Sequence, residues 1–150
     1  MKLKRKDYFF VGMQFLLFFV YLFDFKIISI NSPVLLRMIS GGVTITGIIV
    51  LSLALLQLNK NLSPFPTPKS TSKLTQTGLY HFVRHPIYTG ILLTTFGYAL
   101  YTDSSFKLLI SIVLLILFYF KSSYEESMLL KRYSDYSTYK KKVGRFLPKL

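Results

Sequence analysis

The chain has 150 residues, enough for one domain, which argues against a function that needs two catalytic lobes or a separate regulatory module. Hydrophobic residues make up 51 % of it, while 19 Lys and Arg outnumber 6 Asp and Glu to give a formal net charge of +13. Soluble domains rarely combine so much apolar and basic character, so the two must be segregated along the chain. The absence of Cys excludes disulfides, thiolate nucleophiles and Cys-based zinc or iron–sulfur sites.

Four apolar stretches, bounded by charged residues, Pro or Asn, follow one another along the chain: 8–23, 34–58, 87–101 and 106–120. Because a spanning helix needs about 20 residues, the second stretch fits a membrane span, and the other three must borrow flanking residues or sit in thinned lipid. No small-residue cleavage site follows the first stretch, so we interpret it as a retained span that reaches toward Ile30 rather than as a signal peptide.

Small residues in the second and third stretches predict close helix packing. Gly42 and Thr46 are four residues apart in the second stretch, and a pair of small residues at this spacing lets two helices approach each other. We interpret Gly90, Thr94 and Gly97 in the third stretch in the same way.

The distribution of basic residues predicts the topology. With four spans, sixteen of the nineteen Lys and Arg fall on one side, in the N-terminus, the 59–85 loop and the C-terminal tail. The positive-inside rule places these segments in the cytoplasm. The basic charge is thereby explained without nucleic acid. Within the loop, Pro64, Pro66 and Pro68 predict an extended linker over 61–72.

The fourth stretch predicts a helix that continues beyond the membrane. Ser104 or Ser105 can cap its start, and neither Pro nor Gly interrupts the chain from 104 to 143, so the helix can run through Tyr133. The short connection at 102–105 makes the third and fourth spans an antiparallel hairpin. This hairpin brings residues 84–85 close to the carboxylates of 125–126 at the cytoplasmic edge.

The segment 78–90 concentrates the residues that could carry chemistry. Pro86 suits the first turn of a helix and makes His85 its N-cap, where free backbone N–H groups and the helix dipole favour an anion. Arg84 adds a bidentate donor for a carboxylate or phosphate. Tyr88 lies one turn further along, and Gly90 permits close approach of a ligand.

Simpler interpretations remain open. Arg84 can be an interfacial side chain that extends to water, with His85 as a passive cap. Glu125 can pair with Lys121 along the helix, and Glu126 can be solvated. A metal site at His81 and His85 is disfavoured, because Pro86 breaks the helix that this spacing requires.

Four sequence elements together are specific to one superfamily. They are the segments 74–80 and 84–90, the Glu125-Glu126-x-x-Leu129 element, and the tail 136–148 with its two Tyr and its Arg-Phe-Leu-Pro ending. They resemble the isoprenylcysteine carboxyl methyltransferase and phospholipid methyltransferase superfamily. The resemblance covers about 62–148, more than half of the chain.

The resemblance implies an all-α membrane protein with about four transmembrane helices, a helical C-terminal extension and both termini in the cytoplasm, forming a single domain over 1–150. It implies an S-adenosylmethionine-dependent methyltransferase, multi-pass, in a bacterial inner membrane. Lys121 stands where the family often has Arg. The implied catalytic residues are Arg84, Glu125 and Lys121, and the implied cofactor-binding residues are Leu74, Thr75, Tyr80, His85, Pro86, Ile87, Tyr88, Gly90 and Glu126.

The expected reaction is methyl transfer to a lipophilic or small apolar acceptor at the cytoplasmic face. Direct displacement at a sulfonium needs alignment and exclusion of water but no nucleophilic side chain, which suits a chain without Cys. The lipid bilayer and the acceptor are the expected partners, and nucleic acid and metal are not expected. A carboxylate, an amine and a thiol acceptor all stay open. So do two other functions: an NADPH-dependent membrane reductase of related fold, and a non-enzymatic membrane scaffold.

Overall fold

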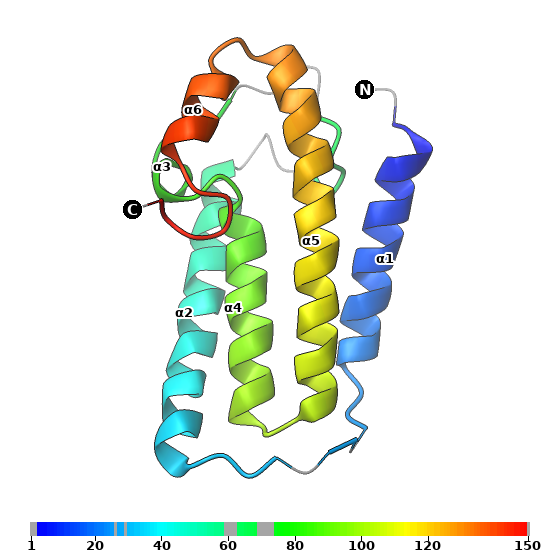
Figure 1. Cartoon of the computed structure of the whole chain (residues 1–150), viewed down its shortest axis with the longest axis vertical. Helices are drawn as coiled ribbons and strands as arrows, with labels where there is room; N and C mark the ends of the chain where they lie inside the picture. The colour runs from blue at the N-terminus through cyan, green and yellow to red at the C-terminus, as the bar shows by residue number, and fades with distance from the viewer. Residues whose placement is uncertain (1–2, 26, 29, 59–62, 69–73, 150) are drawn as a thin grey trace.

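The computed structural model describes residues 3–25, 27–28, 30–58, 63–68 and 74–149. Over these residues the protein is all-helical, as expected, and contains no strand, only an isolated parallel bridge between Val83 and Gly144. Four long helices run side by side, and two short ones, α3 and α6, lie at the end opposite the turn between α4 and α5 (Figure 1). The described helices are α1 (Arg5–Tyr21), α2 (Val34–Leu58), α3 (Leu79–Phe82), α4 (Pro86–Tyr101), α5 (Ser105–Arg132) and α6 (Tyr136–Lys142).

Two of the described helices, α2 and α5, are long and apolar enough to cross a membrane, which is fewer than the four predicted. The helices α1 and α4 contain 17 and 16 residues. At about 1.5 Å per residue such helices are shorter than the ~30 Å of a hydrocarbon core. The four apolar stretches nevertheless coincide with the four long helices.

The first helix ends earlier than predicted. The expectation that it reaches toward Ile30 is wrong, because α1 ends at Tyr21. The ammonium of Lys107 donates to the carbonyl oxygens of Tyr21 (3.0 Å) and Phe23 (2.9 Å), which are left free where the helix stops.

The predicted hairpin is confirmed. Ser104 caps α5, its hydroxyl oxygen accepting from the amide of Lys107 at 3.1 Å. Asp103 makes the turn with a positive φ of 52°. The helix α5 continues to Arg132, so its last turns extend alongside α3 and α6.

Glycines join α2 to α4, but not through the predicted pair. A Cβ at Gly90 would lie 2.6 Å from the backbone nitrogen of Leu51, and one at Gly47 would lie 2.5 Å from that of Thr94. Gly97 contacts α2 equally closely. The expectation that Gly42 and Thr46 bring two helices together is wrong for the described residues, because both are exposed and a Cβ at Gly42 meets nothing within 4 Å.

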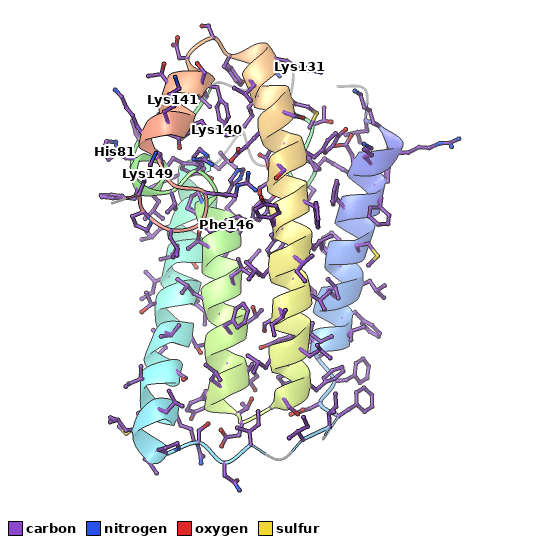
Figure 2. The ribbon with its side chains drawn as sticks, in the orientation of Figure 1. His81, Lys131, Lys140, Lys141, Phe146 and Lys149 are labelled. Atoms are coloured by element: carbon purple, nitrogen blue, oxygen red, sulfur yellow. The ribbon has the colours of Figure 1, made fainter. Side chains whose placement is uncertain are left out.

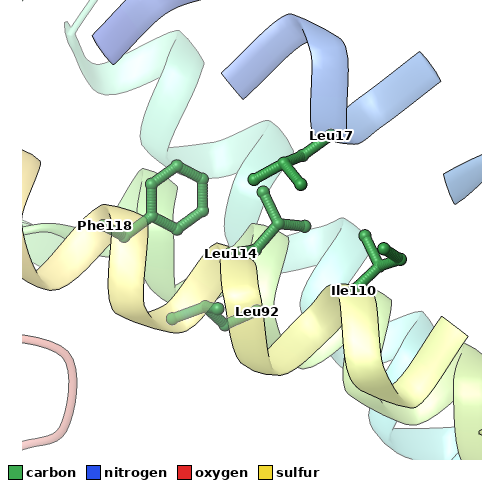
Figure 3. Packing of buried hydrophobic residues seen from close by; sticks show 5 residues of the cluster. All are labelled: Leu17, Leu92, Ile110, Leu114 and Phe118. Carbon is green, nitrogen blue, oxygen red and sulfur yellow. The ribbon is translucent and has the colours of Figure 1, made fainter. Parts of the chain in front are cut away.

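A small apolar core holds α1, α4 and α5 together (Figure 3). Leu17 of α1 packs against Leu114 and Ile110 of α5, next to Leu92 of α4. Phe118, fully buried, extends this core toward the end that carries α3 and α6. The helix α1 therefore packs on α5 while α2 packs on α4, with α4 and α5 in contact between them.

Candidate functional site

The C-terminal segment 143–149 folds back over the start of α4. The amide of Arg84 donates to the carbonyl of Gly144 at 2.8 Å, and that of His85 donates to the carbonyl of Arg145 at 3.1 Å. The predicted N-cap position of His85 is confirmed, although its side chain does not cap the helix. These two backbone N–H groups are thus bonded to the tail.

Glu126 joins α4, α5, α6 and the tail through one buried carboxylate. Its side chain is 1 % exposed, and its Oε1 lies 2.9 Å from Nε of Arg84 and 3.1 Å from Nε2 of His85. Its Oε2 lies 2.9 Å from Nζ of Lys140 and 3.6 Å from Nη2 of Arg145. The predicted proximity of residues 84–85 to the two Glu is confirmed, and the alternative of a solvated Glu126 is wrong.

Arg84 uses its guanidinium to fix the tail. Besides the contact with Glu126, its Nη1 donates to the carbonyl oxygens of Lys140 (3.1 Å) and Val143. The side chain is only 8 % exposed, so the alternative of an interfacial side chain extending to water is wrong. This buried cation is neutralised by Glu126 and bonded to two carbonyls, so it stabilises the packing of α6 and the tail against the segment that precedes α4.

Glu125 has a different environment from its neighbour. Its side chain is 28 % exposed, and its Oε2 accepts from the hydroxyl of Tyr88 at 3.2 Å and lies 3.8 Å from Nδ1 of His85. The ring of Tyr88 stacks between His85 and Phe118, with centroid separations of 5.4 and 4.6 Å. Among the described residues no ion pair joins Glu125 to Lys121, so the pairing considered above is wrong.

Three tyrosines of α3 and α6 lie close to Arg84, His85 and Glu125. The hydroxyl of Tyr139 donates to the carbonyl of Tyr80. Burial raises the pKa of Tyr80 and of Tyr136 well above the usual value, and burial, partly offset by Arg84, raises the pKa of Tyr139 to about 12. All three are therefore neutral phenols. Within the described part of the chain, the buried hydroxyl of Tyr136 has no hydrogen-bond partner.

Two adjoining cavities open around these residues. The smaller, of about 110 Å³, is lined by Tyr136, Tyr139 and the segment 63–68. The larger, of about 490 Å³, extends between the long helices and is lined mainly by apolar side chains of α1, α2 and α4. Both share the walls formed by Tyr80, Arg84, His85 and Glu125, together with Leu58 and Ser63.

The residues implied by the resemblance divide into four groups. Leu74 and Thr75 line the smaller cavity only, and Ile87, Tyr88 and Lys121 line the larger only. Tyr80, Arg84, His85 and Glu125 line both. Pro86, Gly90 and Glu126 line neither: Pro86 is buried in the first turn of α4, Gly90 packs on α2, and Glu126 lies behind the walls.

Sequence reasoning missed several residues of the site. Gln14 lines the larger cavity and bonds to Lys121, and it is the single amide in the apolar stretch 8–23, a signal that could have identified it. Tyr136 and Tyr139 stood in the quoted tail motif without a role. Arg145 also stood in that motif without a role, whereas Lys140 was counted only as basic charge, and nothing local in the sequence distinguishes it from the neighbouring lysines.

Within the described ranges, no group of three or more His, Asp or Glu side chains could hold a metal ion. A family model described as phospholipid methyltransferase matches residues 36–136, which is more than half of the chain. No curated protein matches the sequence. The matched range begins at the start of α2 and ends at the start of α6, so α1 and the C-terminal segment lie outside it.

Proposed function

The chain belongs to the phospholipid methyltransferase family, and on this premise we propose that it transfers a methyl group from S-adenosylmethionine to a lipophilic or small apolar acceptor at the cytoplasmic face of the membrane. One observation carries the proposal: a small cavity with both polar and apolar side chains in its walls adjoins a larger, mainly apolar one, and both share Tyr80, Arg84, His85 and Glu125. A reaction between a polar cofactor and an apolar acceptor needs such a junction.

The residues of the smaller cavity fit the proposed cofactor. Glu125 offers a carboxylate that can accept hydrogen bonds from an ammonium or from ribose hydroxyls. The buried hydroxyl of Tyr136 lacks a partner among the described residues, and a ligand with a hydrogen-bonding group would satisfy it. At about 110 Å³ this cavity is smaller than the ~300–1,000 Å³ typical of ligand pockets, so the cofactor would extend toward the larger cavity.

S-adenosylmethionine, when bound, supplies a methyl group activated by the positive sulfonium. The protein has to align the reactants and exclude water, since this displacement needs no covalent help from a side chain. We assign contact with the reacting groups to Glu125, which lines both cavities, and to Tyr88, which lines the larger cavity and bonds to Glu125. Glu126 acts on the site from behind the cavity walls by holding His85 and α6 in place, and Arg84, which lines both cavities, pairs with it and binds α6 and the tail.

The larger cavity suits an acceptor that arrives from the lipid. Its walls include Phe15 and Phe18 of α1, Leu51 and Leu55 of α2, and Ile91 of α4. The helix α1 packs on α5, whereas α2 packs on α4. The cavity wall formed by α1 and the walls formed by α2 and α4 therefore belong to two different helix pairs. An apolar chain can therefore lie between them, with its polar end directed at Glu125.

We also propose that α1 and α4 lie in the bilayer beside α2 and α5, and that both termini are cytoplasmic. Lys131, Lys140, Lys141 and Lys149 gather at the end of the molecule that carries α3 and α6 (Figure 2). At the opposite end Arg37 pairs with Asp103 at 3.8 Å, and Lys107 is buried. This asymmetry supports a cytoplasmic site. Other basic residues that entered the prediction lie outside the described residues: Lys2, Lys26, Lys60, Lys69 and Lys73.

The test is transfer of a labelled methyl group from S-adenosylmethionine into the lipid, protein and volatile fractions of a membrane extract. We expect label in one of these fractions with the wild-type protein. With Glu125→Gln, which removes the negative charge from the wall that the two cavities share, the rate should fall at least 100-fold. Asp135→Asn, an exposed carboxylate outside both cavities, is the control and should match the wild type. If none of the fractions acquires label, the proposal is contradicted.

A further inference from the structure

The segment 63–68 forms part of the walls of both cavities. Ser63 lines both, Pro64 lines the larger, and the other four residues line the smaller. Every second residue of the segment is proline, which has no backbone N–H, so only three of its six backbone nitrogens can donate a hydrogen bond. The amide of Phe65 donates to Oγ of Ser63 at 3.2 Å, within the segment itself. A segment with so few donors depends on contacts with other elements to stay against the site.

Asp7 of α1 makes such a contact. Its side chain is buried, with 0 % of the residue exposed. Its Oδ1 accepts from the amide of Thr67 at 3.0 Å, and the hydroxyl oxygen of Thr67 lies 2.8 Å from both carboxylate oxygens. Its Oδ2 accepts from the amide of Lys4 at 2.7 Å, which caps α1. One carboxylate therefore begins the first helix and holds the segment 63–68.

Helix capping alone does not explain the burial of Asp7. A carboxylate in the first turn of a helix is stabilised by free N–H groups and by the helix dipole while it stays in water, and burial costs free energy unless hydrogen bonds replace that water. Thr67 supplies these hydrogen bonds, and Sδ of Met128 in α5 lies 3.5 Å from its hydroxyl oxygen. Next to this contact, the ring of Phe65 packs edge-on against that of Tyr8, with centroids 5.6 Å apart. The contact therefore joins the cavity wall to α1 and α5.

We propose that Asp7 is a positioning residue of the methyl-transfer site, which through Thr67 holds the segment 63–68 where it completes the wall of the smaller cavity. The inference rests on the proposed function, because it takes the smaller cavity as the cofactor site. Asp7 lines neither cavity, so it acts through the segment and not by touching a ligand. The helix α1 lies outside the range matched by the family model, whereas the segment lies inside it.

The proposal predicts how the affinity for the cofactor depends on Asp7. When only a fraction of the molecules has the binding-competent arrangement, the apparent affinity falls in proportion to that fraction. Loss of the carboxylate releases the segment in part of the population, so each binding event must first restore the wall. The intrinsic contacts between the ligand and the wall stay the same.

Calorimetry with S-adenosylhomocysteine on the full-length protein in detergent measures this effect. In Asp7→Asn a neutral amide with one acceptor oxygen faces three donors, so we expect binding to weaken about 5-fold or more. Thr67→Val tests the same contact from the other side, also if Asp7→Asn does not fold, and should weaken binding more than Thr67→Ser, which keeps the hydroxyl. Asp135→Asn, the same change at an exposed acid, should bind as the wild type does.

Ser104→Ala separates positioning from stability. Ser104 caps α5 at the end of the molecule opposite α3 and α6, and it lines neither cavity. Its replacement lowers the free energy of unfolding without reaching the segment 63–68, so its affinity for S-adenosylhomocysteine should equal that of the wild type. If Ser104→Ala loses as much affinity as Asp7→Asn, general destabilisation explains the loss and the positioning role is wrong.

Hydrogen exchange of the Thr67 amide, measured by mass spectrometry, reports on the contact itself. We expect the amide to exchange at least about 5-fold faster in Asp7→Asn than in the wild type, and S-adenosylhomocysteine to slow it in the wild type. Equal exchange in both proteins, or faster exchange with wild-type affinity in Asp7→Asn, overturns the assignment and leaves the proposed function standing. A wild type that does not bind S-adenosylhomocysteine contradicts the proposed function and the cofactor role of the segment, and the exchange rates then still decide whether Asp7 holds it.

Discussion

Replacing Glu126 by Gln should separate the residue that holds the site together from the residue that works in it. The carboxylate of Glu126 is 1 % exposed and faces Arg84, which is 8 % exposed, at 2.9 Å. Removing one partner of a buried ion pair costs about 3–5 kcal/mol, because the remaining charge stays buried. Gln keeps the shape and one hydrogen bond, and Lys140 can turn to water, so we expect about 3 kcal/mol in the free energy of unfolding.

The matched variant is Glu125→Gln on the neighbouring position. Its carboxylate is 28 % exposed and accepts one hydrogen bond, from Tyr88. Gln can still accept that bond, so the loss of stability should stay within about 1 kcal/mol. Equilibrium unfolding in detergent measures both values, and limited proteolysis reports whether the segment 143–149 is released. We expect release in Glu126→Gln and not in Glu125→Gln; equal stability losses, or a tail that stays protected in both, would refute the reasoning.

Three further predictions concern the scaffold. Gly97→Ala places a Cβ 2.8 Å from the backbone of α2 and should destabilise the protein by about 1–3 kcal/mol. Gly42→Ala, where a Cβ meets nothing within 4 Å, should be neutral or stabilise the protein by up to about 1 kcal/mol. Thermal unfolding compares the two variants. Tyr139→Phe removes a hydrogen bond to Tyr80 and should cost about 1 kcal/mol. Because burial raises the pKa of Tyr139 to about 12, its neutral form contributes stability that is complete below pH 10 and lost toward pH 12, so the difference between the wild type and this variant should shrink over that range. Ser104→Ala should cost about 1 kcal/mol through loss of the α5 cap.

The helices were predictable because their causes are local. Long apolar stretches bounded by charge and Pro gave the positions of the four long helices, and Ser104 marked the start of α5. The end of α1 was not predictable from the apolar stretch, because it depends on Lys107, which is distant in sequence and binds the carbonyls of Tyr21 and Phe23.

The glycine interface shows why a spacing rule is not enough. Gly42 and Thr46 satisfy the small-residue spacing as well as any pair in α2, but they are on the face that points away from α4. The face that packs is set by the rotation of α2 against α4, which places Gly47 on Thr94 and Leu51 on Gly90. Rotation is a tertiary property that the pattern of one helix does not encode.

The convergence of residues 84–85 with 125–126 was predictable from the hairpin, since helix rise fixes which residues are level with each other. The different roles of the two Glu were not. Burial of Glu126 is produced by Lys140 and Arg145, which arrive from α6 and the tail. The same applies to Lys121, whose partners in α1 and in the segment 63–68 are far away in sequence.

The central claim is that the smaller cavity binds S-adenosylmethionine and its product, and calorimetry on the detergent-purified protein tests it most directly. We expect S-adenosylhomocysteine to bind at one site per chain, NADPH to show no binding, and Tyr136→Phe to weaken the S-adenosylhomocysteine interaction by about 5-fold through loss of one hydrogen bond. Binding of NADPH without binding of S-adenosylhomocysteine would contradict the account and favour a reductase.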